Sequence, residues 1–383
     1  MLISPFKLVE YLGPRELSAP HVLCASDTQT WSVAELLGLA DAKDLERWQT
    51  MELGYNEIEG SLSLRTALVN ALYSELKPEQ VATFAGAEEA IFCTLAGLLQ
   101  AEDHVIALTP CYQAMLEVPK LCGARLTCIE LTPENQWRIN LEAIEKAIQP
   151  NTRWVLINFP HNITGQIITP DELKALITVL DRHGIWLYSD EVYRLSGPHG
   201  TLWPQPACTL YHRAVSLGVL TKPFGLAGLR MGWVACQDPA MLQNITKMKH
   251  YLSICNSAPN EILAEIALKN HEKLLTRNNA IISDNLNAMD AFFARHAELF
   301  SWVRPQGGCV GFVHYQGPDS IDAFCDRVIQ EAGILLVPAT LYDYAKPYFR
   351  LGFGRADLPQ VLRHFSAYLD PLDEYKTKAI RAA

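Results

Sequence analysis

Residues 216–233 read SLGVLTKPFGLAGLRMGW, and in this stretch Lys222 stands between an apolar run and a turn rich in glycine. Arg230 follows eight positions later. A lysine held at a strand end can form a Schiff base with a carbonyl cofactor, and an arginine beside it can bind an anion. The alternative is a surface lysine and a helix-capping arginine in a glycine-rich loop. The stretch points to pyridoxal phosphate, provided that the rest of the chain supplies the other groups that this cofactor needs.

Apolar runs alternate with segments of helical spacing on the N-terminal side of this stretch. Strands are predicted at 80–84, 104–109, 125–130, 153–159 and 185–189. Helices are predicted at 88–99, 141–148 and 171–182. This alternation is typical of an α/β fold in which helices cover both faces of a mainly parallel sheet. Ligands of such sheets bind at the carboxyl ends of the strands.

A smaller α+β unit is expected after about residue 275, packed with the N-terminal residues. It is predicted to contain a long polar helix, a strand at 309–314, a helix from 321, and strands at 334–338 and 348–353. The predicted domains are an N-terminal arm with part of the small domain (1–45), a large cofactor-binding domain (46–272) and a C-terminal small domain (273–383). A chain of 383 residues exceeds the usual limit of one hydrophobic core, which favours two domains.

The composition is that of an ordinary globular protein, with 49% hydrophobic and 19% charged residues. The net charge is −10, and the chain has no run of lysine and arginine. Nucleic acid and anionic membranes are therefore excluded as expected partners, and a small molecule is favoured.

The N-terminus and the cysteines indicate where the protein is located. Residues 1–7 lack a basic start followed by a long apolar run, and no segment approaches the ~20 apolar residues that span a bilayer. The closest of the ten cysteines, Cys122 and Cys128, are six positions apart, and there is no C-x-x-C. We expect reduced, mostly buried thiols, no metal site and a cytoplasmic protein.

Polar groups follow two of the predicted strands. Asp190 ends the strand at 185–189, where its carboxylate can keep a pyridine nitrogen protonated. Asn162, in the turn 158–165, and the hydroxyl of Tyr193 can donate to the ring's phenolic oxygen. The alternatives are a helix N-cap for the aspartate and a backbone-mimicking turn for the asparagine.

An anion site and a stacking ring are also present. Residues 86–89 lie between a strand end and a helix, so free backbone N–H groups and the helix dipole can bind phosphate. Arg230 can bind the same phosphate in a bidentate manner. Tyr112 is placed to stack on the cofactor ring, although a core position is the alternative.

Arg350 interrupts the apolar strand predicted at 348–353. A buried guanidinium needs an anion, and the α-carboxylate of a substrate fits its fork. An internal salt bridge is the alternative.

Taken together, these residues resemble the fold type I pyridoxal phosphate enzymes of aminotransferase class I/II. The resemblance extends from about residue 52 to residue 355, with the motifs in the order and spacing of the family. It implies a large domain built on a mainly parallel seven-stranded sheet between helices, plus a smaller α+β domain. It also implies an enzyme that acts on a free L-α-amino acid through an external aldimine and deprotonation of Cα.

By this resemblance the catalytic residues are Lys222, Asp190 and Tyr193. Lys222 is the Schiff-base lysine and proton shuttle, Asp190 is the partner of the pyridinium, and Asn162 and Tyr193 bind the 3′ oxygen. Ile163 departs from the family, which usually has proline there, so this turn is expected to be less rigid.

The resemblance assigns the phosphate to Arg230 and to the backbone of Ala87 and Glu88. Two residues depart from the family pattern. Val219 stands where many members have a hydroxyl, which leaves Thr221 as the nearby substitute. Glu88 also stands where a hydroxyl is common, so its charge is expected to point away from the phosphate.

The remaining implied contacts concern the cofactor ring, the substrate and the partner. Tyr112 stacks on the ring, and Arg350 and Asn162 bind the substrate. Tyr55 resembles the tyrosine that reaches the phosphate of the neighbouring subunit, which implies a homodimer with active sites at the subunit interface.

Two reactions remain open. Transamination is the main hypothesis, by its frequency in the family alone. A neutral or basic substrate is expected, because residues 231–276 contain no arginine where relatives specific for dicarboxylates often carry a second carboxylate clamp. Glu10 and Asp27 lie in an arm that commonly passes the substrate pocket in this family, so a cationic substrate such as a guanidine fits; surface charge explains them equally well.

The alternative is elimination and cyclisation of a hydroxylated arginine. Residues 158–162, 216–222 and 304–308 look similar to capreomycidine synthase and to enduracididine-forming relatives, although plain aminotransferases have these patterns too.

Two other classes of protein are disfavoured. A regulator that borrows this fold needs an added DNA-binding module, for which there is no room, and a nicotinamide dehydrogenase needs an early G-x-G-x-x-G, which is absent.

Overall fold

A seven-stranded sheet forms the centre of the larger part of the computed structural model, which describes residues 3–382, with side chains as far as Asp370. Its strands, in the order β2-β8-β7-β6-β5-β3-β4, are β2 (Val81–Phe84), β8 (Gly232–Cys236), β7 (Ala214–Val219), β6 (Trp186–Asp190), β5 (Thr152–Asn158), β3 (His104–Thr109) and β4 (Arg125–Glu130). Only β8 runs antiparallel to its neighbours. The predicted mainly parallel seven-stranded sheet is therefore confirmed.

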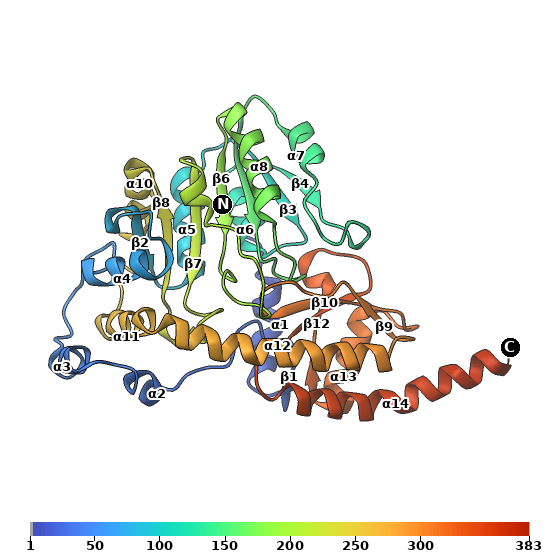
Figure 1. Ribbon diagram of the computed structural model, residues 1–383. Helices are drawn as coiled ribbons and strands as arrows, with labels where there is room; N and C mark the ends of the chain where they lie inside the picture. The colour runs from blue at the N-terminus through green and yellow to red at the C-terminus, as the bar shows by residue number, and fades with distance from the viewer. Residues whose placement is uncertain (1–2, 383) are drawn as a thin grey trace.

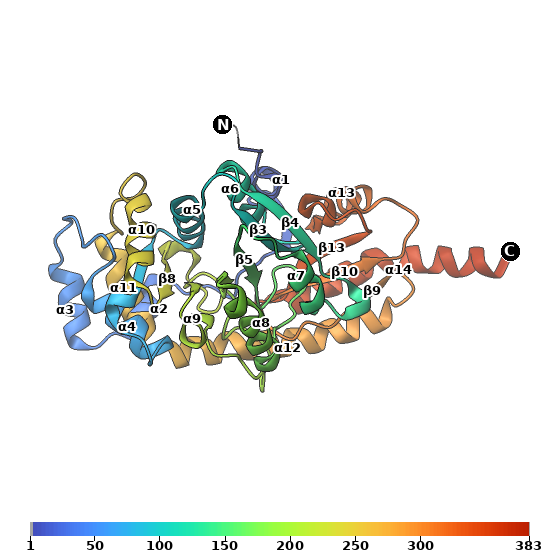
Figure 2. The same cartoon turned by 90° about the horizontal axis from the view of Figure 1, so that it is seen from above.

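The central strands are nearly continuous apolar runs because helices cover both faces of the sheet. In Figure 2, α5 (Ala87–Leu98), α6 (Ala114–Leu121) and α10 (Pro239–Lys249) lie on one side. On the other side are α8 (Pro170–His183) and α9 (Ala207–Leu210), with α7 (Leu141–Ala147) near the β4 edge. At the far edge, α4 (Leu62–Leu72) packs on α11 (Ala258–Lys269).

Local sequence signals explain how α8 starts and stops. Thr169 accepts from the backbone N–H of Glu172, whose carboxylate in turn accepts from the Thr169 N–H, and Pro170 occupies the first helical position. Gly184 ends the helix in the left-handed conformation (φ 65°). The buried Leu173, Leu176, Val179 and Leu180 form the face that packs on the sheet.

The smaller unit is built around an antiparallel sheet of order β12-β13-β10-β9. It contains β9 (Phe300–Trp302), β10 (Val310–Tyr315), α13 (Ile321–Ala332), β11 (Ile334–Leu335), β12 (Val337–Pro338), β13 (Tyr348–Gly352) and α14 (Leu358–Ala382). The single strand predicted at 334–338 was wrong: β11 pairs with the N-terminal β1 (His21–Val22), whereas β12 pairs with β13. The run is apolar throughout, so no residue in it marks the change of sheet.

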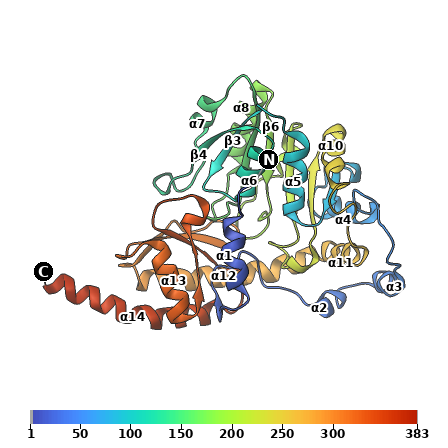
Figure 3. The ribbon, with the colours of Figure 1, turned by 180° about the vertical axis from the view of Figure 1, so that it is seen from behind.

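The N-terminal segment belongs partly to the smaller unit, because β1 pairs with β11. Figure 3 shows α1 (Lys7–Glu16) where the two units meet; α2 (Val33–Leu37) and α3 (Ala42–Thr50) continue along the edge of the larger unit. The long α12 (His271–Arg295) runs beneath both units in Figure 1. The boundary predicted at 272/273 falls in the first turn of this helix, and residues 1, 2 and 383 of the predicted domains lie outside the described part.

Within residues 3–382, none of the helices combines the length and the apolar character that crossing a membrane requires.

Candidate active site

The carboxyl ends of β5 and β6 place two polar residues side by side. Asn158 and Asp190 are partners in the parallel register of these strands, and the Asn158 side chain donates to the Asp190 carbonyl (3.0 Å). The same side chain accepts from the backbone N–H of Asn162 (2.8 Å). The turn that carries Asn162 is thereby fixed next to Asp190.

A cavity of about 370 Å³ opens at these strand ends. It brings together most of the predicted site residues, from both units, and α1 also contributes to its wall. Those that line it are Lys222, Asp190, Asn162, Tyr193, Tyr112, Ala87, Glu88, Thr221, Arg230 and Arg350. Two predicted residues, Tyr55 and Glu10, are not part of its wall.

Lys222 lies beyond the end of β7 with its amine inside the molecule. Its Nζ donates to the Ser26 hydroxyl (2.8 Å), and its carbonyl accepts from the Thr28 hydroxyl (2.7 Å). The Nζ also lies 5.7 Å from the centre of the Tyr193 ring. Burial lowers the pKa of the Lys222 amine, which favours the neutral, nucleophilic form.

Asp190 is buried at the end of β6. Burial raises the pKa of its carboxyl to about 7, although the carboxylate accepts from the Val192 N–H (3.1 Å) and feels the charge of Lys222. A cationic group bound against it would reverse this shift, because an opposite charge nearby favours the carboxylate.

Asn162 and Tyr193 differ in how free they are to bind a ligand. The Asn162 side-chain oxygen is buried and has no hydrogen-bond partner within the described residues. The Tyr193 hydroxyl donates to the Ser26 carbonyl (2.8 Å), so its proton is already engaged. Asn162 therefore has unsatisfied hydrogen-bonding capacity in the cavity wall, whereas the Tyr193 proton already has a partner.

The start of α5 forms an anion cradle. Gly86 caps this helix at φ 92°, and a Cβ on it would come within 2.5 Å of Arg230 Nη2. A Cβ on Gly232 of β8 would likewise come within 2.8 Å of the Ala87 nitrogen. Arg230 itself is left-handed (φ 46°) and donates to the Ala227 carbonyl (3.2 Å). Backbone, helix dipole and guanidinium therefore converge on one point without intervening side chains, which fits a phosphate.

Glu88 lies at the same helix start and lines the cavity together with Tyr112. Burial raises the pKa of the Glu88 carboxyl. The Tyr112 ring in turn lies 5.2 Å from the ring of Phe6 in the N-terminal arm. Tyr112 therefore connects the start of α5 with the N-terminal arm across the cavity wall.

Arg350 is buried in β13, and its guanidinium donates to Tyr342 Oη (2.7 Å) and to the Cys24 carbonyl (2.9 Å). Its Nε has no partner, and none of the described carboxylates forms an ion pair with it. The expected alternative, an internal salt bridge, is therefore not seen among the described residues. A buried cation without an anion at a cavity fits a carboxylate ligand.

The acidic residues of the arm do not all face the cavity. Glu16 lines it, together with other residues on one face of α1. Glu10, the predicted residue, is exposed, and Asp27 pairs with Arg355 (2.9 Å). The spacing of Val9, Leu12 and Glu16 (i, i+3, i+7) is the signal that could have identified Glu16, once the arm was known to be helical at 7–16.

Ser26 and Asn158 are the other site residues that the sequence analysis missed. Asn158 lies near the end of the strand predicted at 153–159 and begins the turn 158–165, so the sequence already indicated a polar residue at a strand end. Ser26 carried no signal, because it approaches Lys222 only across 196 positions of sequence.

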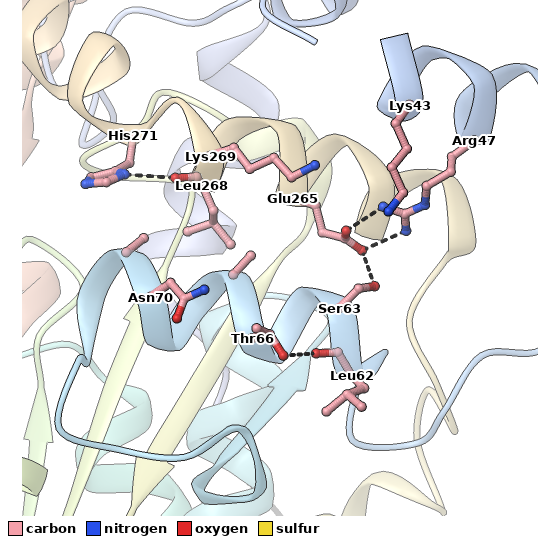
Figure 4. A pocket seen from close by; sticks show the side chains of 12 residues that line it. Lys43, Arg47, Leu62, Ser63, Thr66, Asn70, Glu265, Leu268, Lys269 and His271 are labelled. Carbon is pink, nitrogen blue, oxygen red and sulfur yellow. Dashed lines mark hydrogen bonds and ion pairs between the residues drawn. The ribbon is translucent and has the colours of Figure 1, made fainter. Parts of the chain in front are cut away.

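A second cavity, of about 590 Å³, lies between α3, α4 and α11, away from these groups (Figure 4). Its Arg47 and Glu265 pair at 2.6 Å, and Glu265 also accepts from the Ser63 hydroxyl (2.7 Å). Lys269 binds the Asp44 carboxylate (2.6 Å). These charges already satisfy one another, so this cavity is the weaker candidate.

Comparison with known proteins gives consistent matches. The family model described as aminotransferase class I and II matches residues 38–365. Capreomycidine synthase of Streptomyces vinaceus is 28% identical over 294 residues, which cover 76% of this chain and 74% of that protein. Two crystal structures superpose over 97% of the chain. One is a PLP-dependent aminotransferase from Streptococcus suis 89-1591 (TM-score 0.91, 28% identity, 99% of that chain). The other is PLP-dependent cyclase OrfR in complex with Au (TM-score 0.87, 25% identity, 98% of that chain).

Proposed function

Because the chain belongs to the aminotransferase class I and II family and is a pyridoxal-phosphate-dependent enzyme, we propose that it transaminates a free L-α-amino acid with a neutral or basic side chain. The observation that carries this proposal is Arg350, a buried guanidinium without an anion. It lines the same cavity as Lys222 and Asp190. A substrate α-carboxylate supplies the missing charge and brings its Cα toward the lysine.

The cavity wall supports the assignment of the cofactor residues. Asp190 would hold a proton on the ring nitrogen, Asn162 and Tyr193 would face the phenolic oxygen, and Tyr112 would stack on the ring. The phosphate would be held by Arg230, Thr221 and the backbone N–H groups of Ala87 and Glu88. When bound, the cofactor supplies an electron-withdrawing ring that acidifies the Cα proton of an amino acid.

The residues of this chain then move one proton. Lys222 Nζ takes the proton from Cα, because burial lowers the pKa of this amine and its hydrogen bond to Ser26 orients it. Arg350 holds the carboxylate in place during this transfer, and α1 shields the site from water. With the cofactor bound, the substrate nitrogen would stay on the cofactor, water would supply the oxygen of the departing 2-oxo acid, and Lys222 would return the proton.

The charges of the wall support a neutral or basic side chain. Its three cations, Lys222, Arg230 and Arg350, each have a role already. Among the described lining residues no further cation remains for a second substrate carboxylate, whereas the exposed Glu16 of α1 also lines the cavity. Like charges would disfavour a dicarboxylic substrate here.

A second candidate function is the cyclisation of a hydroxylated arginine. It is favoured by the similarity to a capreomycidine synthase and to a PLP-dependent cyclase. Glu16 supports it as well, because a guanidinium can pair with a carboxylate in the wall. This reaction begins with the same proton transfer and differs in the loss of water from the side chain.

One incubation separates the two reactions. The purified enzyme is mixed with arginine or 4-hydroxyarginine, with and without pyruvate or 2-oxoglutarate, and the products are identified by mass. Transamination requires the oxo acid and yields a 2-oxo acid. A product that has lost water and forms without the oxo acid would replace transamination by cyclisation.

Attachment of the cofactor is tested with Lys222→Ala. The wild type should show a visible absorption band, and borohydride should fix the cofactor on the peptide that contains Lys222. The variant should lose this band and about 10²- to 10⁴-fold of its turnover. An unchanged band in Lys222→Ala would show that another lysine is used.

The enzyme also acts as a homodimer in this proposal. Tyr55 is 88% exposed and lies outside the cavity, as expected for a side chain that serves a partner. In this proposal it forms one surface, here called the docking surface, with the other exposed apolar residues of two connections that Lys249 joins; the five residues are Leu53, Tyr55, Tyr251, Leu252 and Ile254. A second copy of the chain would cover this surface and bring its own Tyr55 to the phosphate cradle.

The ten free thiols support a cytoplasmic location.

A further inference from the structure

The last residue of α10, Lys249, is a buried cation outside the active-site cavity. Its Nζ donates to the carbonyls of Ile58 (2.6 Å) and Thr83 (2.8 Å) and to Asn256 Oδ1 (3.2 Å). These bonds use all three of its N–H groups. Among the described side chains no carboxylate forms an ion pair with it. A methionine would fill a similar volume without the cost of burying a charge, so the hydrogen bonds must be what this lysine contributes.

The three acceptors lie on three different segments. Ile58 belongs to the connection between α3 and α4, Thr83 to β2, and Asn256 to the connection between α10 and α11. Asn256 extends the network, because its Nδ2 donates to Thr83 Oγ1 (2.5 Å) and to Glu261 (3.2 Å). Glu261 in turn accepts from the Ser61 N–H (3.1 Å). One ammonium therefore joins both connections to the end of β2.

The phosphate cradle is tied to the same network. Thr83 lies in β2, which leads directly into Gly86. Glu89, in the first turn of α5, accepts from the N–H of Ala85 (2.6 Å) and from the N–H of Ser253 (3.1 Å). A displacement of residues 250–257 would therefore be transmitted to the backbone that receives the phosphate.

Both connections also carry the docking surface. Leu53 and Tyr55 lie on the first, and Tyr251, Leu252 and Ile254 lie on the second. These five side chains are between 47% and 88% exposed, although they are apolar. The network of Lys249 thus connects the phosphate cradle on one side with the docking surface on the other.

We propose that Lys249 is a positioning residue that couples the two, so that binding of the cofactor phosphate and docking of a second copy of the chain strengthen each other. Such coupling is reciprocal by thermodynamic necessity. The inference rests on the proposed function, which supplies both the cofactor and the homodimer.

The test compares Lys249→Met with Lys247→Met. Lys247 lies on the same helix, is exposed and bonds only Asn244, three residues away, so it serves as the matched control. For each protein the dimer dissociation constant is measured by sedimentation with and without saturating pyridoxal phosphate. The dissociation constants of pyridoxal phosphate and of pyridoxal, which lacks the phosphate, are measured by titration of the apoenzyme.

In the wild type and in Lys247→Met, saturating cofactor should tighten the dimer at least tenfold. In Lys249→Met this ratio should fall below threefold. The affinity for pyridoxal phosphate should fall at least tenfold, while that for pyridoxal changes less than threefold. A purely structural role would weaken the dimer and both ligands without changing the ratio, and that result would overturn the proposal.

Hydrogen exchange of the wild type keeps the proposal testable even if Lys249→Met does not fold. Inorganic phosphate added to the apoenzyme should slow exchange in residues 57–61 and 250–257. Unchanged exchange in both segments, with phosphate bound, would refute the coupling. If the wild type fails to bind pyridoxal phosphate or stays monomeric, the proposed function fails instead, so the two failures are distinguishable.

Discussion

At the scale of single residues, the site consists of buried charged groups whose partners are missing or incomplete. Asp190 and Arg350 are buried and Lys222 is half-buried, and desolvation raises the pKa of Asp190 and lowers that of Lys222, in both cases toward the neutral form. Burying such groups costs stability, and they persist where a ligand supplies the missing interaction. The cofactor and the substrate carboxylate are that ligand here.

Asp190→Asn should change how the stability of the apoenzyme depends on pH. In the wild type the folded-state pKa, about 7, lies above the ordinary value of 3.8, so the folded protein holds an extra proton between these values. The resulting stabilisation is complete below the lower value and is lost as pH rises through the upper one. As pH rises from 5 to 7, the free energy of unfolding of the wild type should therefore fall on the order of 2 kcal/mol relative to that of the variant.

Denaturant unfolding of both apoenzymes across this pH range measures the difference. Parallel pH profiles would show that Asp190 does not titrate there. In the holoenzyme the same variant should keep the cofactor and lose most of its turnover, because the ring nitrogen loses its proton-holding partner.

Gly86→Ala tests the phosphate cradle. The new Cβ would lie within 2.5 Å of Arg230 Nη2, at a φ of 92° that alanine rarely adopts. The guanidinium would have to move away from this Cβ, and losing its charge-assisted contact to the phosphate costs about 1.5–3 kcal/mol, roughly a tenfold loss of affinity or more for pyridoxal phosphate. Gly228→Ala is the control, since a Cβ there meets nothing within 4 Å. Cofactor titration should separate the two variants, and equal affinities would place the phosphate elsewhere.

At the scale of elements, the ends of strands and helices position the site, whereas helices such as α8 only cover the sheet. The capping box of Thr169 and Glu172 stabilises α8 at a distance from the cavity. Thr169→Ala should therefore lower the free energy of unfolding by about 1 kcal/mol and leave kcat unchanged. Thr178→Ala, an exposed position within the same helix, is the matched control. Urea unfolding measures the loss of stability, and steady-state kinetics measures kcat. A fall in kcat without loss of stability would contradict this division of roles.

At the scale of the whole molecule, the cavity joins both units and the N-terminal arm. Its wall includes residues of α1, of the large sheet and of β13, so a bound cofactor favours the folded arrangement of all three. Removing the cofactor should lower the Tm, and restoring it to about 100 times its Kd should return roughly 2.7 kcal/mol. Thermal unfolding of both forms at one protein concentration checks this. Equal Tm values would mean that the cofactor binds folded and unfolded chain alike.

The sequence by itself determined the class of fold and most of the cavity wall. The alternation of apolar runs and helical spacing predicted the parallel sheet, with bounds at 104–109 and 125–130 that β3 and β4 match. Lys222, Asp190 and Arg230 were identifiable because strand ends and glycine turns are local features, legible within a few residues.

Only the tertiary structure decided the contacts between distant segments. Ser26 reaches Lys222 across 196 residues, Glu16 rather than Glu10 faces the cavity, and residues 334–338 divide between two sheets. Lys249 is indistinguishable from a surface lysine in the sequence, yet it is buried and joins three segments. The reason is physical: local sequence fixes backbone periodicity, whereas burial and pairing of polar groups depend on which segments the packed core brings together.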